Sequence, residues 1–239
     1  MAEVRLECKN VAKHFGSLKA LDNVTFALAG PIIKGLIGPN GSGKTVLLNS
    51  ITGIPYGPDS GSISFGGKSI EKLRPTQICR LGIARTFQTL TFFPSLTVEQ
   101  NLLVATAGTN KDAVEKALGI TDLGQKRSMK AGGLGVFDLK KLMIATSLGL
   151  DPRLLLLDEP LSGLSEEESL QTVAILKQIN DAGIALLVVE HKLRKVVDLC
   201  SELFVMHLGK VIAEGDPSQV MNREEVLKAY FGEEEHAQG

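Results

Sequence analysis

Residues 38–45 read Gly38-Pro39-Asn40-Gly41-Ser42-Gly43-Lys44-Thr45 and fit the phosphate-binding loop pattern G-x-x-x-x-G-K-[ST]. The apolar residues within 32–37 predict a buried strand before this loop, interrupted by Lys34 and Gly35. The apolar residues within 46–51 predict a helix after it, which Gly53 can end. The stretch therefore predicts a strand, a phosphate-binding loop and a helix, with a plain glycine-rich turn between strand and helix as the alternative.

The residue types of this loop suit the binding of phosphate groups. Glycines let the backbone approach phosphate oxygens closely with its N–H groups pointing inward. The N-terminus of the following helix adds positive potential at the same place. Lys44 supplies a point charge for the outer phosphates, and the Thr45 hydroxyl is placed to ligate magnesium. We therefore predict that the chain binds a nucleoside triphosphate.

The composition is that of an ordinary globular protein of 239 residues, 44% of them hydrophobic. A formal net charge of −1 gives no electrostatic footprint for nucleic acid or for an anionic membrane. The three cysteines lie far apart, which favours a reducing compartment and argues against a thiol-ligated metal site. No apolar run approaches the roughly 18 residues that span a membrane, and we expect no signal peptide. Work at a membrane would therefore require another chain to hold this one there.

The periodicity of apolar residues divides the chain into a mixed α/β part and a helical part. Val4–Leu6, Leu21–Ala29 and Gly61–Phe65 alternate like half-exposed strands, whereas residues 97–150 have helical spacing. Three later apolar runs suit parallel strands covered on both faces, and a helical stretch, Leu170–Ile179, separates the first two. The runs are Leu154–Leu157, Ile184–Val189 and Leu203–His207. We predict one domain, 1–239, with a core lobe at 1–89 and 151–239 and a helical lobe at 90–150.

The second strong pattern is the run of leucines at 154–157 that ends in Asp158 and Glu159. A buried strand with this ending places Asp158 near the metal and Glu159 one residue farther, facing the γ-phosphate. Asp158 would hold magnesium through water, and Glu159 would act as the general base on the attacking water. The alternative is a buried strand whose carboxylates cap the next loop. Together with the phosphate-binding loop, the pair predicts nucleotide hydrolysis.

These motifs together resemble those of the ATPase subunits of ABC transporters, over nearly the whole chain. The resemblance is carried by the phosphate-binding loop, by Asp158-Glu159-Pro160, and by Glu190-His191 after a third apolar strand. Further strings resemble the subunits of branched-chain amino-acid importers. They are Phe15–Leu21, Gly82–Gln88, Ala213–Gly215 and Ala229–Gly232. The resemblance implies an α/β fold: a P-loop NTPase core of the ABC type, with an N-terminal antiparallel β part and an inserted helical lobe.

The resemblance also implies roles for single residues, with ATP and Mg²⁺ as the ligands. Phe15 falls where the family stacks an aromatic ring on adenine, the alternative being a ring buried beside the first strand. Gln88 falls at the glutamine that reaches the metal and the attacking water, the alternative being a surface glutamine. His191 falls at the switch histidine that contacts the γ-phosphate, the alternative being a polar residue satisfied after a strand. The predicted residues are Lys44, Glu159 and His191 for catalysis, Thr45, Gln88 and Asp158 for the metal, and Phe15, Gly38, Pro39, Asn40, Gly41, Ser42, Gly43, Lys44, Thr45 and Val46 for the nucleotide.

The family's signature segment, usually Leu-Ser-Gly-Gly-Gln, is altered in this chain. An alignment without a gap places residues 134–138 there, with Gly135 in place of the serine. Phe137 then occupies a position where the branch keeps glycine, and a ring would block close approach of backbone to phosphate. A rival alignment takes residues 131–133 as the signature and inserts four residues, about one helical turn. We favour the ungapped alignment, and the signature is degenerate in both.

Three smaller departures point the same way. Val46 stands where the family usually has a second hydroxyl after Thr45. Ser165 stands where the family's dimer-facing loop usually has Asp or Asn, and Gln100 stands where the family usually has glutamate. Lys44, Thr45, Asp158, Glu159 and His191 are intact, whereas segment 134–138, donated to a partner's site, is altered. This pattern favours an asymmetric heterodimer over a homodimer.

The resemblance implies an ATP-binding and ATP-hydrolysing subunit that powers a membrane importer for branched-chain amino acids. Its partners would be a second ABC ATPase subunit, permease subunits reached through the loop after Gln88, and indirectly a substrate-binding protein, with no nucleic acid. The permease would hold the chain at the cytoplasmic face of the membrane. Urea and amide importers have similar subunits, so the cargo stays open. Two other functions stay open as well: a regulatory ATP-binding module with little hydrolysis, and a soluble ABC-type ATPase not coupled to transport.

Overall fold

The computed structural model describes residues 5–87, 89–108, 110–191 and 193–231. An antiparallel four-stranded sheet forms the N-terminal part, in the order β2-β1-β4-β5. Its strands are β1 (Arg5–Phe15), β2 (Leu18–Ala29), β4 (Ser60–Phe65) and β5 (Lys68–Ser69). The alternating strands predicted in this part of the chain are confirmed where they lie in the described residues.

A six-stranded sheet forms the centre of the molecule, in the order β10-β9-β3-β8-β7-β6. Its strands are β3 (Ile33–Ile37), β6 (Ile83–Arg85), β7 (Leu154–Asp158), β8 (Ala185–Val189), β9 (Glu202–His207) and β10 (Lys210–Gly215). Neighbouring strands are parallel except β10, which runs antiparallel to β9. The predicted fold class is confirmed: a mixed α/β core with a separate antiparallel β part.

Strand β3 corrects one prediction, because neither Lys34 nor Gly35 interrupts it. Lys34 is only 1% exposed, and its ammonium donates hydrogen bonds to the Ala27 carbonyl at 2.6 Å and to Glu202 at 2.9 Å. A buried charge is tolerated when it is paired and hydrogen-bonded in this way. Gly35 is needed for packing, since a Cβ there would lie 2.2 Å from the side chain of Leu203.

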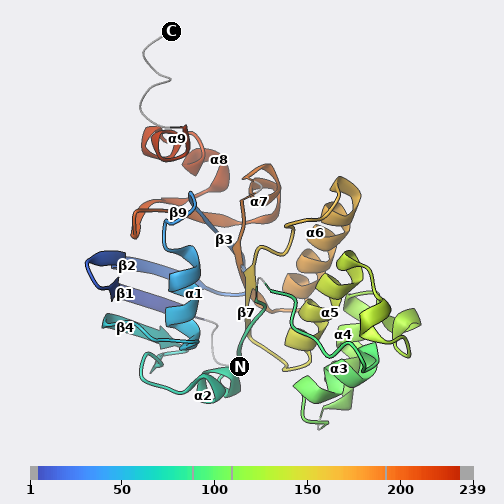
Figure 1. The fold of residues 1–239 in the computed structure, drawn as a ribbon. Helices are drawn as coiled ribbons and strands as arrows, with labels where there is room; N and C mark the ends of the chain where they lie inside the picture. The colour runs from blue at the N-terminus through green and yellow to red at the C-terminus, as the bar shows by residue number, and fades with distance from the viewer. Residues whose placement is uncertain (1–4, 88, 109, 192, 232–239) are drawn as a thin grey trace.

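The helices cover both faces of the central sheet. In Figure 1, α1 lies beside the antiparallel sheet, α3, α4 and α5 gather on the opposite side next to α6, and α7, α8 and α9 lie together at one end. Their bounds are α1 (Lys44–Thr52), α2 (Pro75–Arg80), α3 (Val98–Ala105), α4 (Lys111–Ile120), α5 (Val136–Leu148), α6 (Glu166–Asp181), α7 (Leu193–Leu199), α8 (Pro217–Val220) and α9 (Glu224–Phe231), with 3₁₀ turns at Gly124–Lys126 and Ala131–Gly133. Within the described part of the chain, none of the helices is long and apolar enough to cross a membrane.

The central sheet separates two hydrophobic cores, which explains the run of leucines at 154–157. Leu154 and Leu156 pack with α1 and the antiparallel sheet, whereas Leu155 and Leu157 pack against the helices of the other face. Successive side chains of a strand point to opposite faces, so a strand covered twice is apolar throughout. Burial of each leucine side chain contributes about 1.5–3 kcal/mol to the free energy of folding. The strand therefore holds its last residue, Asp158, in a fixed position.

Candidate active site

The loop between β3 and α1 is held tightly by its neighbours. Gly38 has φ 153° and Gly43 has φ 103°. A Cβ at Gly38 would lie 2.1 Å from the Met206 carbonyl oxygen, and one at Gly43 would lie 2.5 Å from the Ala20 carbonyl oxygen. Both positions therefore require glycine for space as well as for conformation.

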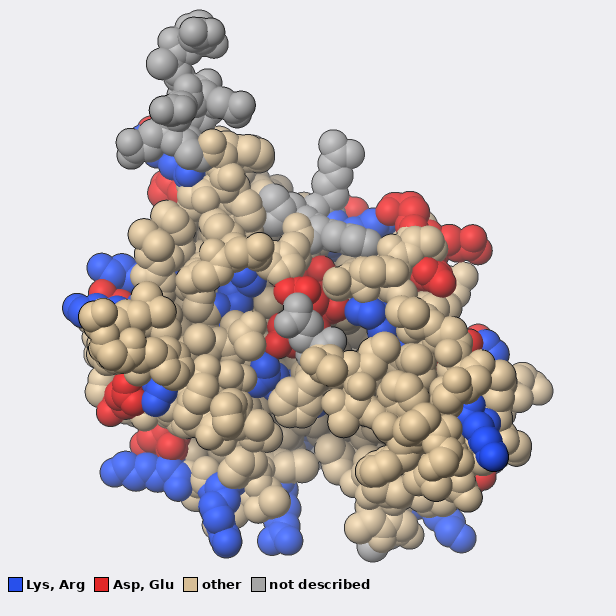
Figure 2. Space-filling view, in the orientation of Figure 1, with Lys and Arg blue, Asp and Glu red and all other residues tan. Residues whose placement is uncertain are grey.

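An open cavity of about 580 Å³ lies against this loop and brings most of the predicted residues together. Figure 2 shows acidic side chains gathered near the centre of the visible face, with basic side chains close by. The predicted residues that line the cavity are Phe15, Asn40, Gly41, Gly43, Lys44, Thr45, Val46, Glu159 and His191. Gly38, Pro39 and Ser42 belong to the same loop but not to the lining, and Ser42 is buried. Gln88 lies outside the described residues.

Lys44 is the first residue of α1, and its side chain folds over the loop. Its ammonium donates hydrogen bonds to the carbonyl oxygens of Gly38 at 2.8 Å and Pro39 at 2.9 Å. Burial lowers the pKa of Lys44, and the carboxylates of Glu159 and Asp158 oppose this shift. The geometry thus places a cation between the phosphate-binding loop and the two predicted acids.

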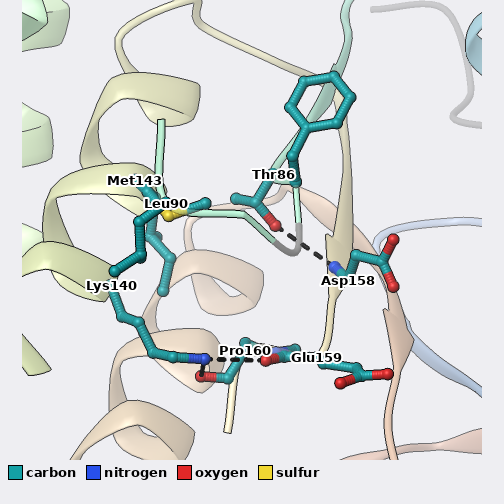
Figure 3. A pocket seen from close by; sticks show the side chains of 9 residues that line it. Thr86, Leu90, Lys140, Met143, Asp158, Glu159 and Pro160 are labelled. Atoms are coloured by element: carbon teal, nitrogen blue, oxygen red, sulfur yellow. Dashed lines mark hydrogen bonds between the residues drawn. The ribbon is translucent and has the colours of Figure 1, made fainter. Parts of the chain in front are cut away.

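Asp158 ends β7 with a carboxylate that is 2% exposed. Its Oδ2 accepts a hydrogen bond from Arg85 Nη2 at 3.0 Å, and Arg85 Nη1 donates to Asn49 Oδ1 at 2.7 Å. The Thr86 hydroxyl accepts from the Asp158 backbone N–H at 3.3 Å (Figure 3). Sequence reasoning missed Arg85, although a charged residue directly after Ile83-Ala84 in an apolar strand was a usable signal.

Glu159 directly follows β7, and its backbone lies in the left-handed region with φ 53°. Its Oε1 lies 2.6 Å from His191 Nε2, and its backbone N–H donates to the Val189 carbonyl at 2.9 Å. The predicted base and the predicted switch histidine are therefore in direct contact on the cavity wall. Because an ionised carboxylate only accepts, His191 donates from Nε2 in this contact.

Two further residues fix the segment around Glu159, and sequence reasoning assigned neither a role. Glu190 is 1% exposed, and its carboxylate accepts from the backbone N–H groups of Leu161 at 2.6 Å and His191 at 3.2 Å. Lys140, on α5, donates to the carbonyl oxygen of Glu159 at 3.0 Å (Figure 3). An acid directly after a buried strand was a signal for Glu190. No sequence pattern indicated a role for Lys140, because its partner Glu159 is not adjacent in sequence.

Phe15 ends β1 and is 43% exposed at the mouth of the cavity. The alternative of a ring buried beside the first strand is therefore wrong. The Phe15 ring contacts the ring of Tyr56, with the two centroids 5.1 Å apart and the two planes at 71°. Edge-to-face contacts of this kind are favourable for aromatic pairs.

Residues 134–138, where the ungapped alignment predicts the signature segment, lie at the start of α5. Gly135 is the N-cap residue, and no side chain caps the helix there. The Phe137 ring lies over the ammonium of Lys141, 5.1 Å from the ring centroid, and Asp138 pairs with Lys126 at 2.6 Å. Residues 131–133, the rival segment, form a 3₁₀ turn before this helix.

The oxygen groups near the loop fit a magnesium ion bound together with a nucleotide. Magnesium is usually held by one or two carboxylates plus substrate phosphates and water, not by a cage of protein ligands. Thr45 offers an exposed hydroxyl on the cavity wall, and Asp158 offers a buried carboxylate from β7. Among the described residues no group of three His, Cys, Asp or Glu side chains gathers to hold a metal without the nucleotide.

The chain belongs to the ABC transporter family, whose model matches residues 21–162. The model of the branched-chain amino acid ATP-binding cassette transporter matches residues 210–236. The predicted family is thereby confirmed, and with it the predicted class of enzyme: the chain is an ATPase of the ABC type.

Curated relatives and solved structures agree with this assignment. A probable branched-chain amino acid transport ATP-binding protein LivG of Archaeoglobus fulgidus is 34% identical over 245 residues, covering 95% of both chains. The high-affinity branched-chain amino acid transport ATP-binding protein LivG of Escherichia coli K12 is 32% identical over 255 residues, covering 98% of this chain and 100% of the relative. The ADP conformation of MJ1267, an ATP-binding cassette of an ABC transporter, has a TM-score of 0.88 at 30% identity, covering 98% of this chain and 100% of the other.

Proposed function

We propose that this chain is the ATP-hydrolysing subunit of an importer for branched-chain amino acids. The observation that carries the proposal is the contact of Glu159 with His191 on the wall of the cavity that also holds Lys44 and Thr45. A carboxylate, a histidine and a lysine beside a phosphate-binding loop are the groups that phosphoryl transfer to water needs. The cargo is supported by the matched segment 210–236 and by the names of the relatives.

In the proposed mechanism, each residue acts on a different part of the reaction. Lys44 stabilises negative charge on the outer phosphates, and the backbone N–H groups of the loop hold the phosphates in place. Glu159 accepts the proton of the attacking water, while His191 orients the Glu159 carboxylate. Thr45 and Asp158 would hold Mg²⁺, which neutralises charge on the phosphate oxygens when bound. We also propose that Gln88 reaches the metal and the attacking water.

Two variants test this assignment. We expect Lys44→Ala to abolish tight ATP binding, because the loop loses its only side-chain cation. We expect Glu159→Gln to bind ATP while its turnover falls by roughly 10²–10⁴-fold, the usual contribution of a general base. ATP binding and steady-state hydrolysis are measured on the same preparations. Unchanged turnover in Glu159→Gln would remove Glu159 from its role, and ATP binding without turnover by the assembled wild-type transporter would favour the regulatory module.

We further propose permease subunits as the partners that bring this chain to the cytoplasmic face of the membrane, with the loop after Gln88 as the contact. A substrate-binding protein would take part indirectly. ATP-driven uptake by vesicles that contain the chain and its permease tests the cargo, with leucine, urea and a short amide as the offered substrates. Uptake of urea or the amide alone would contradict the proposed cargo.

We also propose a core lobe at 1–89 and 151–239 and a helical lobe at 90–150. Helices α3, α4 and α5 all lie within 90–150 and pack on one another, which supports this division. Because α5 carries the altered signature segment and Lys140 reaches the Glu159 carbonyl, the two lobes meet beside the hydrolytic residues.

The altered signature leads us to propose an asymmetric pair with a second ABC ATPase subunit. Phe137 stands where a glycine would let the backbone approach the partner's nucleotide, so two copies of this chain would form two poor sites. Hydrolysis per subunit is measured over a concentration series for the wild type, for Phe137→Gly and, as control, for Val136→Ala at the exposed neighbouring position. We expect self-association to increase the rate only in Phe137→Gly. A wild-type rate that rises with concentration would refute the asymmetric pair.

A further inference from the structure

Tyr56 packs against Phe15 and is not among the residues that line the cavity. It belongs to the connection between α1 and β4, and it is half-buried. The two rings meet edge to face with centroids 5.1 Å apart, and only Phe15 lines the cavity. Phe15 is followed by Gly16, which has φ 60° and no side chain to support the ring. The contact with Tyr56 is therefore a support for an exposed ring at the end of a strand.

The hydroxyl of Tyr56 is hydrogen-bonded to Asn49. Asn49 Nδ2 donates to the Tyr56 hydroxyl at 2.9 Å, and Asn49 Oδ1 accepts from Arg85 Nη1 at 2.7 Å. Because arginine can only donate, Asn49 must turn its oxygen toward Arg85 and its NH₂ group toward Tyr56. Arg85 in turn donates to the carboxylate of Asp158 at 3.0 Å. An unbroken series of hydrogen bonds thus connects the ring that packs against Phe15 to the acid at the end of β7.

A lysine ammonium lies over both rings. The ammonium of Lys13 lies 5.1 Å from the Tyr56 ring centroid and 5.7 Å from that of Phe15. Asp59 fixes this ammonium at 2.6 Å and also accepts from the His14 backbone N–H at 2.7 Å. Cations over aromatic faces are attracted to the ring electrons. Tyr56 is therefore restrained both at its hydroxyl and at its ring.

We propose that Tyr56 is a positioning residue for nucleobase binding: it fixes the Phe15 ring in the orientation that stacks on adenine. This inference rests on the proposed role of Phe15. A ring that is already held in place loses less freedom when a base stacks on it, so the restraint increases affinity for the base without touching the ligand. An aromatic pair of this geometry corresponds to about a two- to tenfold change in affinity.

The test compares two ligands that differ in the nucleobase. Binding of ATP and of inorganic tripolyphosphate to the whole chain is measured by calorimetry at one magnesium concentration. We expect Tyr56→Leu to weaken ATP binding about two- to tenfold and to leave tripolyphosphate binding unchanged, with KM for ATP raised and kcat retained. We expect Tyr56→Phe, which keeps the ring and loses only the bond to Asn49, to show a smaller loss that is again selective for ATP. Phe93→Leu, at an exposed aromatic outside the cavity, is the matched control.

Each other outcome overturns the inference. Equal weakening of both ligands would show that Tyr56 supports the phosphate-binding loop and not the base. No change for either ligand in both Tyr56 variants would show that Phe15 needs no support. Phe15→Ala separates the two proposals: if it weakens ATP selectively while the Tyr56 variants do not, only the inference fails. If Phe15→Ala changes nothing, the proposed stacking on Phe15 fails first. Should Tyr56→Leu not fold, Tyr56→Phe decides alone.

Discussion

Replacing Arg85 by methionine is expected to lower the free energy of unfolding by about 3–5 kcal/mol. The side chains of Arg85 and Asp158 are 4% and 2% exposed, so the variant would leave a carboxylate in the interior without its partner. Asn49 would also lose the donor at 2.7 Å. Methionine fills a similar volume, so the loss of charge and hydrogen bonds outweighs any loss of packing.

Two features of the wild type act in the opposite direction and set the lower end of this range. Burial lowers the pKa of the Arg85 guanidinium, because its charged form is held away from water. Its Nε is buried and has no hydrogen-bond partner among the described residues. The variant is relieved of holding a charge away from water and of the unsatisfied Nε, which alone costs about 1–3 kcal/mol. We therefore expect the measured loss to lie nearer to about 3 kcal/mol than to 5.

Urea unfolding followed by circular dichroism measures this loss. With a denaturant dependence of about 2–3 kcal/mol per molar urea, the midpoint should fall by about 1–2 M. Arg80→Met, at the exposed end of α2, is the control and should change stability by less than about 0.5 kcal/mol. A midpoint for Arg85→Met that coincides with the control would refute the reasoning, because the ion pair would then contribute nothing.

Three further predictions concern other parts of the molecule. Burial raises the pKa of all three thiols, and Cys79 is the half-buried one while Cys8 and Cys200 are buried. At pH 8 a thiol reagent should therefore label only Cys79 in the native protein. Labelling of Cys8 or Cys200 before unfolding would contradict this prediction. Tyr230→Phe should change Tm by less than about 2 °C, because burial raises the pKa of Tyr230 to about 12 while the backbone N–H of Gly38 partly satisfies the hydroxyl; a larger fall in Tm would reveal a full hydrogen bond to that hydroxyl. Gly43→Ala should abolish ATP binding measured by calorimetry, since its Cβ would press on a backbone carbonyl of β2 at 2.5 Å, and retained binding would mean that the loop can shift.

The parts of the fold that could be predicted are those with contiguous signals. The phosphate-binding loop with its strand and helix, and the leucine strand with its terminal acids, each lie within a few adjacent residues. Their patterns reflect local backbone geometry and burial on both faces, which a sequence records directly. The strand at 33–37 was predicted with an interruption because a lysine inside a strand usually marks exposure. Its buried ammonium is satisfied by residues of other strands, which no local pattern reveals.

The contacts around the two acids could not be predicted, because their partners are distant in sequence. Arg85 reaches Asp158 across 73 residues, and Lys140 reaches Glu159 across 19. The first pair forms because the parallel strands β6 and β7 lie side by side, and the second because Lys140 reaches from helix α5 to the residue that follows β7. The partners of charged residues within or beside buried strands could therefore not be predicted from the sequence.

The left-handed backbone of Glu159 has a consequence for how this chain can evolve. An L-residue in that region costs about 1–2 kcal/mol, which glycine would avoid. If Glu159 is the general base, selection for turnover opposes its replacement, whereas a laboratory selection for heat resistance alone would favour glycine there. Glycine at position 159 would be favoured in such a screen, and under the proposed role of Glu159 these clones would not hydrolyse ATP. Any programme of directed evolution on this scaffold must therefore select for hydrolysis and stability together.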